Sequence, residues 1–224
     1  MTVLGVLFDY GGVLTTPTRA SIEAWTRREG IDPHSFSEVL KAWLSRSAPP
    51  GNPLHQLEIG GLELAGFNAA LTPRLRMADG GPVAEADHLG GIFATMAPEP
   101  AMIALVEDLR ARDIRLALVS NSWGNHYPED VLRLFDVVVI SSEVGLRKPQ
   151  REIYALALER LGLAPHESIL VDDGAPNIEA GERLGITGVL HVHPATTLEA
   201  LARLVPKLTA PFPKTLPIQK EHHP

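Results

Sequence analysis

The sequence predicts an α/β protein with a doubly wound parallel sheet and a block of helices inserted after its first strand. From about residue 99 onwards, short apolar runs alternate with amphipathic helical patterns. Several apolar runs stop abruptly at polar residues, as buried strands of a parallel sheet do. Between the first run and this alternating region, no convincing strand pattern occurs. Such alternation favours right-handed crossovers and a sheet covered by helices on both faces.

The first predicted strand leads into the most informative turn of the chain. The segment VLGVLFDYGGVL, residues 3–14, is an apolar run that stops at Asp9 and continues into Gly11 and Gly12. Ligand sites of open α/β sheets lie beyond the carboxyl ends of their strands. A buried carboxylate there calls for a metal, a cation or a catalytic role. Asp9 is therefore a candidate site residue, and capping of a turn or helix is the alternative interpretation.

The block at residues 18–95 is expected to be helical. Four helical patterns, joined by turns rich in proline and glycine, occur in SIEAWTRREG, SFSEVLKAWLSR, GLELAGFNAALTPRL and AEADHLGGIFATM. A helical block between the first strand and the next strand–helix unit is best explained as an insertion.

The remaining elements are expected to alternate between helix and strand. Helices are predicted over PEPAMIALVEDLRARD, PEDVLRLF, REIYALALERLGL and APNIEAGERLG, and strands over LALVS, VVVIS, SILVD and ITGVLHV. Residues 206–224 are a proline-rich tail without periodicity, which we expect to lie along the surface or to be disordered.

Three further segments place chemically useful residues after apolar runs. Ser120 ends the run RLALVS, Lys148 stands in a loop after VVVIS, and the pair Asp172–Asp173 ends the run SILVDD. Each has a structural alternative: a helix N-cap for the serine, a solvated charge for the lysine, turn residues for the aspartates. Their joint occurrence at the ends of successive predicted strands favours one common site with Asp9.

Composition limits the classes of function. The formal charge is −7 and the sequence pI is near 5.7, which argues against nucleic-acid binding. The chain has no cysteine, so disulfides and thiol catalysis are excluded, and a cytoplasmic setting is expected. No apolar stretch approaches the roughly 20 residues that span a bilayer, so no membrane partner is expected. An apolar face of the helical block would serve a homodimer or close over the rest of the protein, and these alternatives stay open.

Four motifs together resemble those of the haloacid dehalogenase superfamily of aspartate-nucleophile hydrolases. FDYGGVLT resembles the first motif, LVSNS the second, Lys148 of RKP the third, and VDDGAPNIEAG the fourth. The resemblance extends from residue 3 to about residue 190. It implies a Rossmann-like core at residues 1–15 and 96–205 and a small helical cap at residues 16–95.

The resemblance implies a Mg²⁺-dependent phosphohydrolase that acts on a small phosphorylated metabolite. Mg²⁺ prefers oxygen ligands, which Asp9, Asp172 and the backbone carbonyl of Gly11 would supply. Asp173 would lie in the outer shell or bind the metal through water. Asp9 would attack phosphorus and form an aspartyl-phosphate intermediate. The cation and Lys148 are expected to keep Asp9 ionised.

The same resemblance implies a set of phosphate ligands. Ser120, the backbone amide of Asn121 and the side chain of Lys148 would bind the phosphoryl oxygens. The amides at Gly11 and Gly12 would join them, because glycine lets the backbone approach an anion closely.

Gly11 departs from the pattern of most phosphatases of the superfamily, which carry a second aspartate there as general acid. General acid–base help is worth about 10²–10⁴-fold. An Asp-x-Gly subgroup that includes sugar-1-phosphate phosphatases resembles this chain, so we expect a preference for good leaving groups. Alternatively, Glu58 or His55 of the cap replaces the acid. Tyr10 is not expected to do so, since adjacent strand residues point to opposite sides.

Two other functions remain as alternatives. The 2-haloacid dehalogenases also lack the second aspartate, although the carboxylates of Asp172 and Asp173 would repel a carboxylate substrate unless a cation is bound. A binding or regulatory protein that kept the fold and lost catalysis is the other. Neither the physiological substrate nor the oligomeric state is determined by the sequence.

Overall fold

The computed structural model describes residues 3–44, 48–49 and 51–205. The predicted tail at residues 206–224 lies outside them. The described chain forms one five-stranded sheet of parallel strands in the order β3-β2-β1-β4-β5, which confirms the predicted fold class. The strands are β1 (Gly5–Phe8), β2 (Arg115–Ser120), β3 (Val137–Ile140), β4 (Ser168–Asp172) and β5 (Thr187–Leu190). Because β1 lies between β2 and β4, the winding reverses there, and ligands bind at such a reversal.

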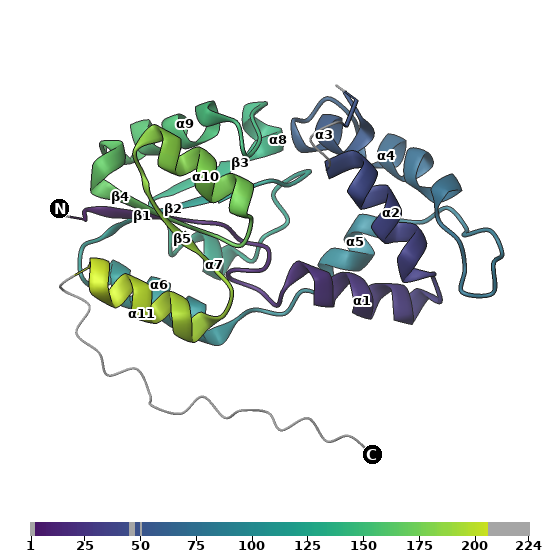
Figure 1. Ribbon diagram of the computed structural model, residues 1–224, viewed down its shortest axis with the longest axis horizontal. Coiled ribbons are helices and arrows are strands. Elements are labelled where there is room, and N and C mark those ends of the chain that lie inside the picture. The colour runs from purple at the N-terminus through teal and green to yellow at the C-terminus, as the bar shows by residue number, and fades with distance from the viewer. Residues whose placement is uncertain (1–2, 45–47, 50, 206–224) are drawn as a thin grey trace, which may run out of the picture.

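Helices cover both faces of this sheet (Figure 1). One face packs against α6 (Pro100–Arg110) and α11 (Pro194–Leu204), and the other packs against α9 (Arg151–Leu161) and α10 (Ala175–Leu184). The short helices α7 (Glu129–Leu132) and α8 (Ser141–Val144) follow β2 and β3. The sequence pattern does not predict α8 or α11. A single turn such as α8 is too short to show a helical period. The last predicted strand, ITGVLHV, runs to residue 192, but β5 ends at Leu190, so the chain can begin α11 at Pro194.

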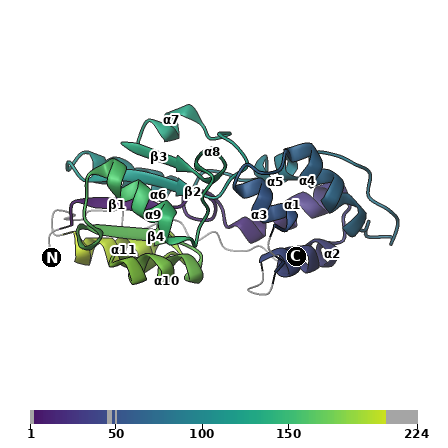
Figure 2. The ribbon, with the colours of Figure 1, turned by 90° about the horizontal axis from the view of Figure 1, so that it is seen from above.

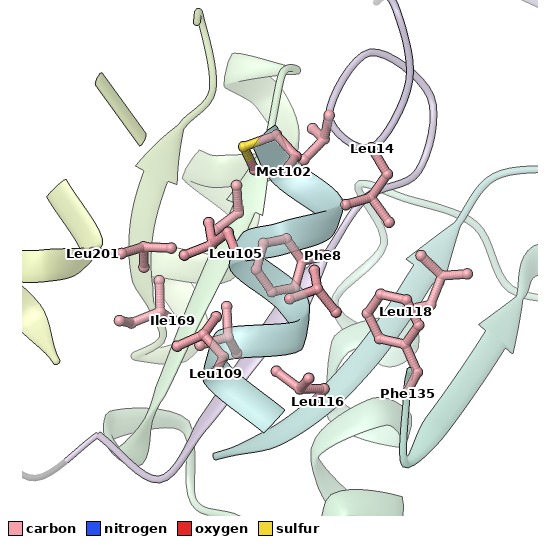
Figure 3. Packing of buried hydrophobic residues seen from close by; sticks show 14 of the residues in the cluster. Phe8, Leu14, Met102, Leu105, Leu109, Leu116, Leu118, Phe135, Ile169 and Leu201 are labelled. Atoms are coloured by element: carbon pink, nitrogen blue, oxygen red, sulfur yellow. The ribbon is translucent and has the colours of Figure 1, made fainter. Parts of the chain in front are cut away.

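The strands are buried on both sides, so their apolar residues alternate between two hydrophobic clusters. Val6 and Phe8 belong to the cluster beneath α6 and α11, whereas Leu7 belongs to the cluster beneath α9 and α10. Figure 3 shows Phe8 against Leu105 of α6, with Ile169 of β4 nearby. This two-sided burial explains why the strands are continuous apolar runs.

Five α-helices of the described chain lie between β1 and α6, at one end of the sheet (Figures 1 and 2), and we call them the cap helices. They pack around their own hydrophobic cluster, which includes Trp25, Phe36 and Leu71. The sequence predicts four helices here, and the structure adds α3, a six-residue helix that Asn52 caps by accepting from the amide of His55. The cap helices are α1 (Thr18–Glu29), α2 (Pro33–Leu44), α3 (Pro53–Glu58), α4 (Leu64–Leu71) and α5 (His88–Phe93), with a 3₁₀ turn at Thr72–Arg74.

The two chain segments that join the cap helices to the sheet run side by side. Thr15 and Pro98 form an antiparallel bridge, and the amide of Glu99 donates to the carbonyl of Leu14 at 2.8 Å. The cap helices are therefore tied to the sheet where β1 delivers its last residues. Within the described residues, no helix combines the length and the apolar character that crossing a membrane requires.

Candidate active site

Asp9 lies immediately beyond β1 and is held there by both neighbouring strands and loops. Its amide donates to the carbonyl of Val171 on β4 at 2.9 Å. Its Oδ1 accepts from the amide of Tyr10 at 2.7 Å and lies 2.7 Å from Nζ of Lys148. Only 8% of Asp9 is exposed, so the carboxylate meets solvent chiefly through the cavity described below.

Lys148 bridges two carboxylates from a buried position. Its Nζ is also 2.6 Å from Oδ2 of Asp172, and 2% of the residue is exposed. The side chain of Asn121 fixes the lysine's backbone, since Oδ1 accepts from the amide of Lys148 at 2.8 Å and Nδ2 donates to its carbonyl at 3.1 Å. The predicted ligand Asn121 therefore uses its side chain to position the lysine loop against β2.

Three carboxylates gather at this sheet edge. Oxygens of Asp9, Asp172 and Asp173 all lie within 4.8 Å of one another. Oδ1 of Asp172 accepts from the amide of Gly174 and from Nδ2 of Asn177, each at 2.8 Å. Three carboxylates near one ammonium leave excess negative charge at a site where Asp9 and Asp172 are buried and Asp173 is exposed, and an all-oxygen donor set is what Mg²⁺ takes. The residues thus fit a hard divalent cation.

The charges of Asp9, Lys148, Asp172 and Asp173 influence the pKa values of Asp9 and Lys148. Burial raises the pKa of Asp9 to about 7; Lys148 opposes this, while Asp172 and Asp173 add to it. Burial alone would lower the pKa of Lys148, but Asp172 and Asp9 outweigh burial and raise it. Without a bound cation, Lys148 alone therefore does not hold the pKa of Asp9 at its ordinary value. A cation near the carboxylates would favour the ionised form.

Ser120, the last residue of β2, is buried beside this group and accepts a hydrogen bond that the sequence does not predict. The hydroxyl of Tyr127 donates to Oγ of Ser120 at 2.8 Å. Burial raises the pKa of Tyr127 to about 12, so the phenol keeps its proton and remains a donor. Because Tyr127 fills one acceptor position, the serine's own proton is free to point into the cavity.

The two glycines after Asp9 differ in backbone conformation and in the space available for a side chain. The amide of Gly12 donates to Oγ1 of Thr15 at 3.1 Å, so it is not directed at a ligand as the sequence interpretation expects. Gly12 has a φ of +81°, and a Cβ there would come within 2.4 Å of Oδ2 of Asp173. Gly11 does not have a positive φ, and a Cβ there would meet only Oγ1 of Thr18, at 3.5 Å. The absence of a side chain at Gly12 therefore lets Asp173 pack against the backbone, whereas Gly11 borders the cavity and has space for a side chain.

Most of these groups line a cavity of about 230 Å³, although Asp172 and Gly12 do not. Glu58 and His55 do not line it, and Glu58 pairs instead with Arg147. Tyr10 does line it, because β1 ends at Phe8 and the alternation of a strand no longer applies. A larger groove of about 980 Å³ follows α1 and α2, and none of the strand-end residues line it. The lining of the smaller cavity consists of Asp9, Tyr10, Gly11, Thr18, Phe93, Met96, Ser120, Asn121, Ser122, Trp123, Tyr127, Lys148, Asp173 and Asn177.

Comparison with known families agrees with this geometry. The sequence model of the haloacid dehalogenase-like hydrolases matches residues 3–185, which is most of the chain. The chain belongs to this family.

Relatives of this haloacid dehalogenase-like hydrolase include a much longer protein and two phosphatases of nearly equal length. It is 33% identical over 126 residues to Acyl-CoA dehydrogenase family member 10 of Mus musculus, covering 54% of this chain and 12% of that protein. It is 25% identical to Sesquiterpene phosphatase astK of Aspergillus oryzae, covering 91% of this chain and 97% of that protein. It is 27% identical to Validoxylamine A 7'-phosphate phosphatase of Streptomyces hygroscopicus subsp. limoneus, covering 91% and 93%.

Solved structures of the family share the fold. A HAD family enzyme from Bacteroides thetaiotaomicron, in complex with magnesium and inorganic phosphate, superposes with a TM-score of 0.62 at 21% identity. The match covers 85% of this chain and 94% of that one. At this identity the likeness establishes the α/β fold of this haloacid dehalogenase-like hydrolase.

Proposed function

We propose that this protein is a Mg²⁺-dependent phosphohydrolase that cleaves a small phosphorylated metabolite through an aspartyl-phosphate on Asp9. The observation that carries the proposal is the buried contact of Asp9 with Lys148, beside Ser120 and two further carboxylates. A dianionic phosphoryl group needs neutralisation and in-line positioning, and this group of residues provides charge of both signs for these tasks.

The proposed first step forms a bond between Asp9 and phosphorus. Lys148 and the amide of Tyr10 both contact Oδ1, which favours Oδ2 as the attacking oxygen. The bond from phosphorus to the leaving oxygen breaks, and that oxygen takes a proton from water. A second water then attacks phosphorus, releases inorganic phosphate and regenerates the Asp9 carboxylate.

The remaining residues would hold the reacting groups in place. Asp9, Asp172 and the carbonyl of Gly11 would hold Mg²⁺, with Asp173 next to it. The bound cation supplies positive charge that offsets the charge of the phosphoryl group. Lys148, Ser120 and the amide of Asn121 would bind the phosphoryl oxygens.

The relatives support the class of reaction but not one substrate. The two relatives of nearly equal length are named as phosphatases of a sesquiterpene and of validoxylamine A 7'-phosphate. The Bacteroides enzyme binds both magnesium and phosphate. We infer phosphate ester hydrolysis for this chain, and a preference for good leaving groups because no carboxylic acid occupies the Gly11 position.

The test is release of phosphate from acetyl phosphate and p-nitrophenyl phosphate, with Mg²⁺ and with EDTA. We expect turnover only with Mg²⁺, and loss of it in Asp9→Asn, which removes the charge with little change in shape. Asp113→Asn is the matched control, because Asp113 is exposed in a turn at φ 60°, which asparagine accepts.

Chloroacetate distinguishes the dehalogenase alternative. Chloride release from chloroacetate in EDTA, without phosphate release from acetyl phosphate or p-nitrophenyl phosphate, would overturn the proposal. So would unchanged turnover in Asp9→Asn.

A further inference from the structure

Aromatic rings form a large part of the lining of the cavity. Phe93 of α5 stands at the centre of these rings. Its centroid lies 6.1 Å from that of Tyr10 in a stacked arrangement, and 6.0 Å from those of Tyr127 and Trp123 in edge-to-face arrangements. Tyr10 and Tyr127 are themselves in edge contact at 4.5 Å. We call Tyr10, Phe93, Met96, Trp123 and Tyr127 the ring wall.

The ring wall is built from both parts of the molecule. Phe93 comes from a cap helix yet packs against the hydrophobic cluster of the sheet. Trp123 comes from the loop after β2 yet packs against the cluster of the cap helices. The two rings thus cross the junction in opposite directions, so the wall exists only when the cap helices lie against the sheet as they do here.

No residue of the ring wall carries a charged side chain. Among the described residues that line the cavity, the charged ones are Asp9 and Asp173, which follow strands, and Lys148, which lies in the loop after α8. The other polar lining residues carry no charge, and one of them, Ser120, accepts a hydrogen bond from Tyr127 of the wall. A second charged group on the substrate would lose its hydration against the wall without gaining an ionic partner.

The size of the cavity limits what fits against the wall. Its volume is about 230 Å³. A cavity of about 150 Å³ holds benzene in another protein, so a phosphoryl group and one ring of that size are of the right order for this space. Phe93, Met96 and Trp123 are each only partly buried, and apolar surface of this kind gains most by being covered with apolar groups.

We propose that the alcohol part of the substrate is uncharged, largely apolar and about the size of one ring, and that the ring wall binds it. This inference rests on the proposed phosphohydrolase function and narrows its substrate class. It excludes sugar bisphosphates, phosphorylated carboxylic acids and nucleotides as preferred substrates. Stacking and edge contacts with a flat group add to simple burial in such a site.

The experiment separates recognition of the ring from the reactivity of the ester. Benzyl phosphate and glycerol 1-phosphate are both esters of primary alcohols, so the difference in leaving-group ability is small compared with that of aryl esters. We expect kcat/KM for benzyl phosphate to exceed that for glycerol 1-phosphate at least tenfold. Benzylphosphonate, which cannot be hydrolysed, is expected to inhibit at least tenfold more strongly than methylphosphonate.

Variants locate the effect in the ring wall. Phe93→Leu and Trp123→Leu keep an apolar side chain and remove the ring, and each is expected to reduce the benzyl preference at least threefold. Leu62→Ala is the matched control, because Leu62 is a partly buried cap residue that packs on the cap cluster and does not line the cavity. It is expected to leave the preference unchanged. Should a wall variant fail to fold, the two phosphonates on the unaltered protein still test the inference.

Each outcome decides between the two proposals. Equal kcat/KM for the benzyl and glycerol esters, with equal inhibition by the two phosphonates, overturns the ring-wall inference while the phosphohydrolase function stands. Failure to hydrolyse any of the esters or acetyl phosphate overturns the function. In that case preferential binding of benzylphosphonate, measured by calorimetry, would support the ring wall as a binding site, and equal binding would overturn it.

Discussion

Arg147 and Glu58 form an ion pair across the junction between the cap helices and the sheet, with Nε of Arg147 2.5 Å from Oε2 of Glu58. The side chains are 14% and 13% exposed. Burial raises the pKa of Glu58, and the opposing effect of Arg147 does not cancel it. Arg147 directly precedes Lys148, so the pair ties α3 to the loop that carries the site's ammonium group. The sequence alternative, in which Glu58 protonates the leaving group, is therefore less favoured than a positioning role.

Removal of one member of this pair is expected to destabilise the protein more than removal of both. Breaking a fully buried pair costs about 3–5 kcal/mol, so we expect Glu58→Gln to lower the free energy of unfolding by about 2 kcal/mol at this slight exposure. Glu58→Leu combined with Arg147→Met should cost less than either Glu58→Leu or Arg147→Met alone. Urea denaturation of the four proteins measures the coupling, and strict additivity would contradict it.

The same Glu58→Gln variant tests the general-acid alternative. A lost general acid would lower kcat on alkyl phosphates by about 10²–10⁴-fold. We expect a change of less than about tenfold, equal for alkyl and aryl esters, because Glu58 does not line the cavity. A large loss confined to alkyl esters would restore Glu58 as the acid.

Mg²⁺ binding should depend on pH through Asp9. Burial raises the pKa of Asp9 to about 7 in the metal-free protein, so below pH 7 the cation must displace a proton. The apparent affinity is expected to rise by up to about tenfold per pH unit between pH 5 and 7 and to level off above it. Calorimetry in buffers of different ionisation enthalpy measures the released proton. Asp9→Asn should bind Mg²⁺ more weakly and lose most of this release.

Tyr127→Phe tests whether the hydroxyl above Ser120 orients the serine. The variant removes the donor at 2.8 Å and keeps the ring. We expect a loss of stability of about 1 kcal/mol, as for one buried hydrogen bond, together with a rise in KM. In Ser120→Ala the second change Tyr127→Phe should add little to KM. Independent, additive effects on KM would show that the tyrosine acts otherwise.

The strand-end part of the site follows from the sequence because parallel strands direct their carboxyl ends to one edge. Asp9, Ser120 and Asp172 each follow an apolar run, and the order of the strands brings them together. The sequence indicates Lys148 through its loop after an apolar run and through the family motif, whereas its contacts depend on how Asn121 holds that loop. The fold class could be predicted for a similar reason, because strand and helix periods are visible within single segments.

The ring wall and the part played by Gly12 could not be predicted in this way. Tyr10, Phe93 and Trp123 come from three separate segments, and their meeting depends on how the cap helices lie on the sheet. Tyr127 reaches Ser120 only because the loop after β2 turns back, which no periodic pattern encodes. The amide of Gly12 is taken by Thr15 through a local turn. The features that the sequence pattern does not predict, namely the ring wall and the hydrogen bonds of Tyr127 and Gly12, therefore depend mostly on contacts made by loops.

Gly11→Asp is the most direct test of the missing general acid, and the backbone permits it. Gly11 does not have a positive φ, and a new Cβ would make only an ordinary contact with Oγ1 of Thr18 at 3.5 Å. If the reaction is limited by protonation of the leaving oxygen, the introduced carboxyl should raise kcat/KM on alkyl phosphates by at least about tenfold, within the 10²–10⁴ that acid catalysis offers. Aryl esters, whose leaving groups need no proton, should change far less.

Two further variants make that result interpretable. Gly11→Asn adds a side chain of similar size without an acid, so it should not accelerate alkyl esters. Gly12→Asp should fold poorly, because a Cβ at φ +81° would come within 2.4 Å of Oδ2 of Asp173. A plot of log kcat/KM against leaving-group pKa should be steep for the unaltered protein and flatter in Gly11→Asp.

If the unaltered protein already gives a flat plot, a group in the cavity protonates the leaving oxygen. Thr18 would then be the first to test by Thr18→Val, since its hydroxyl lies nearest the Gly11 position.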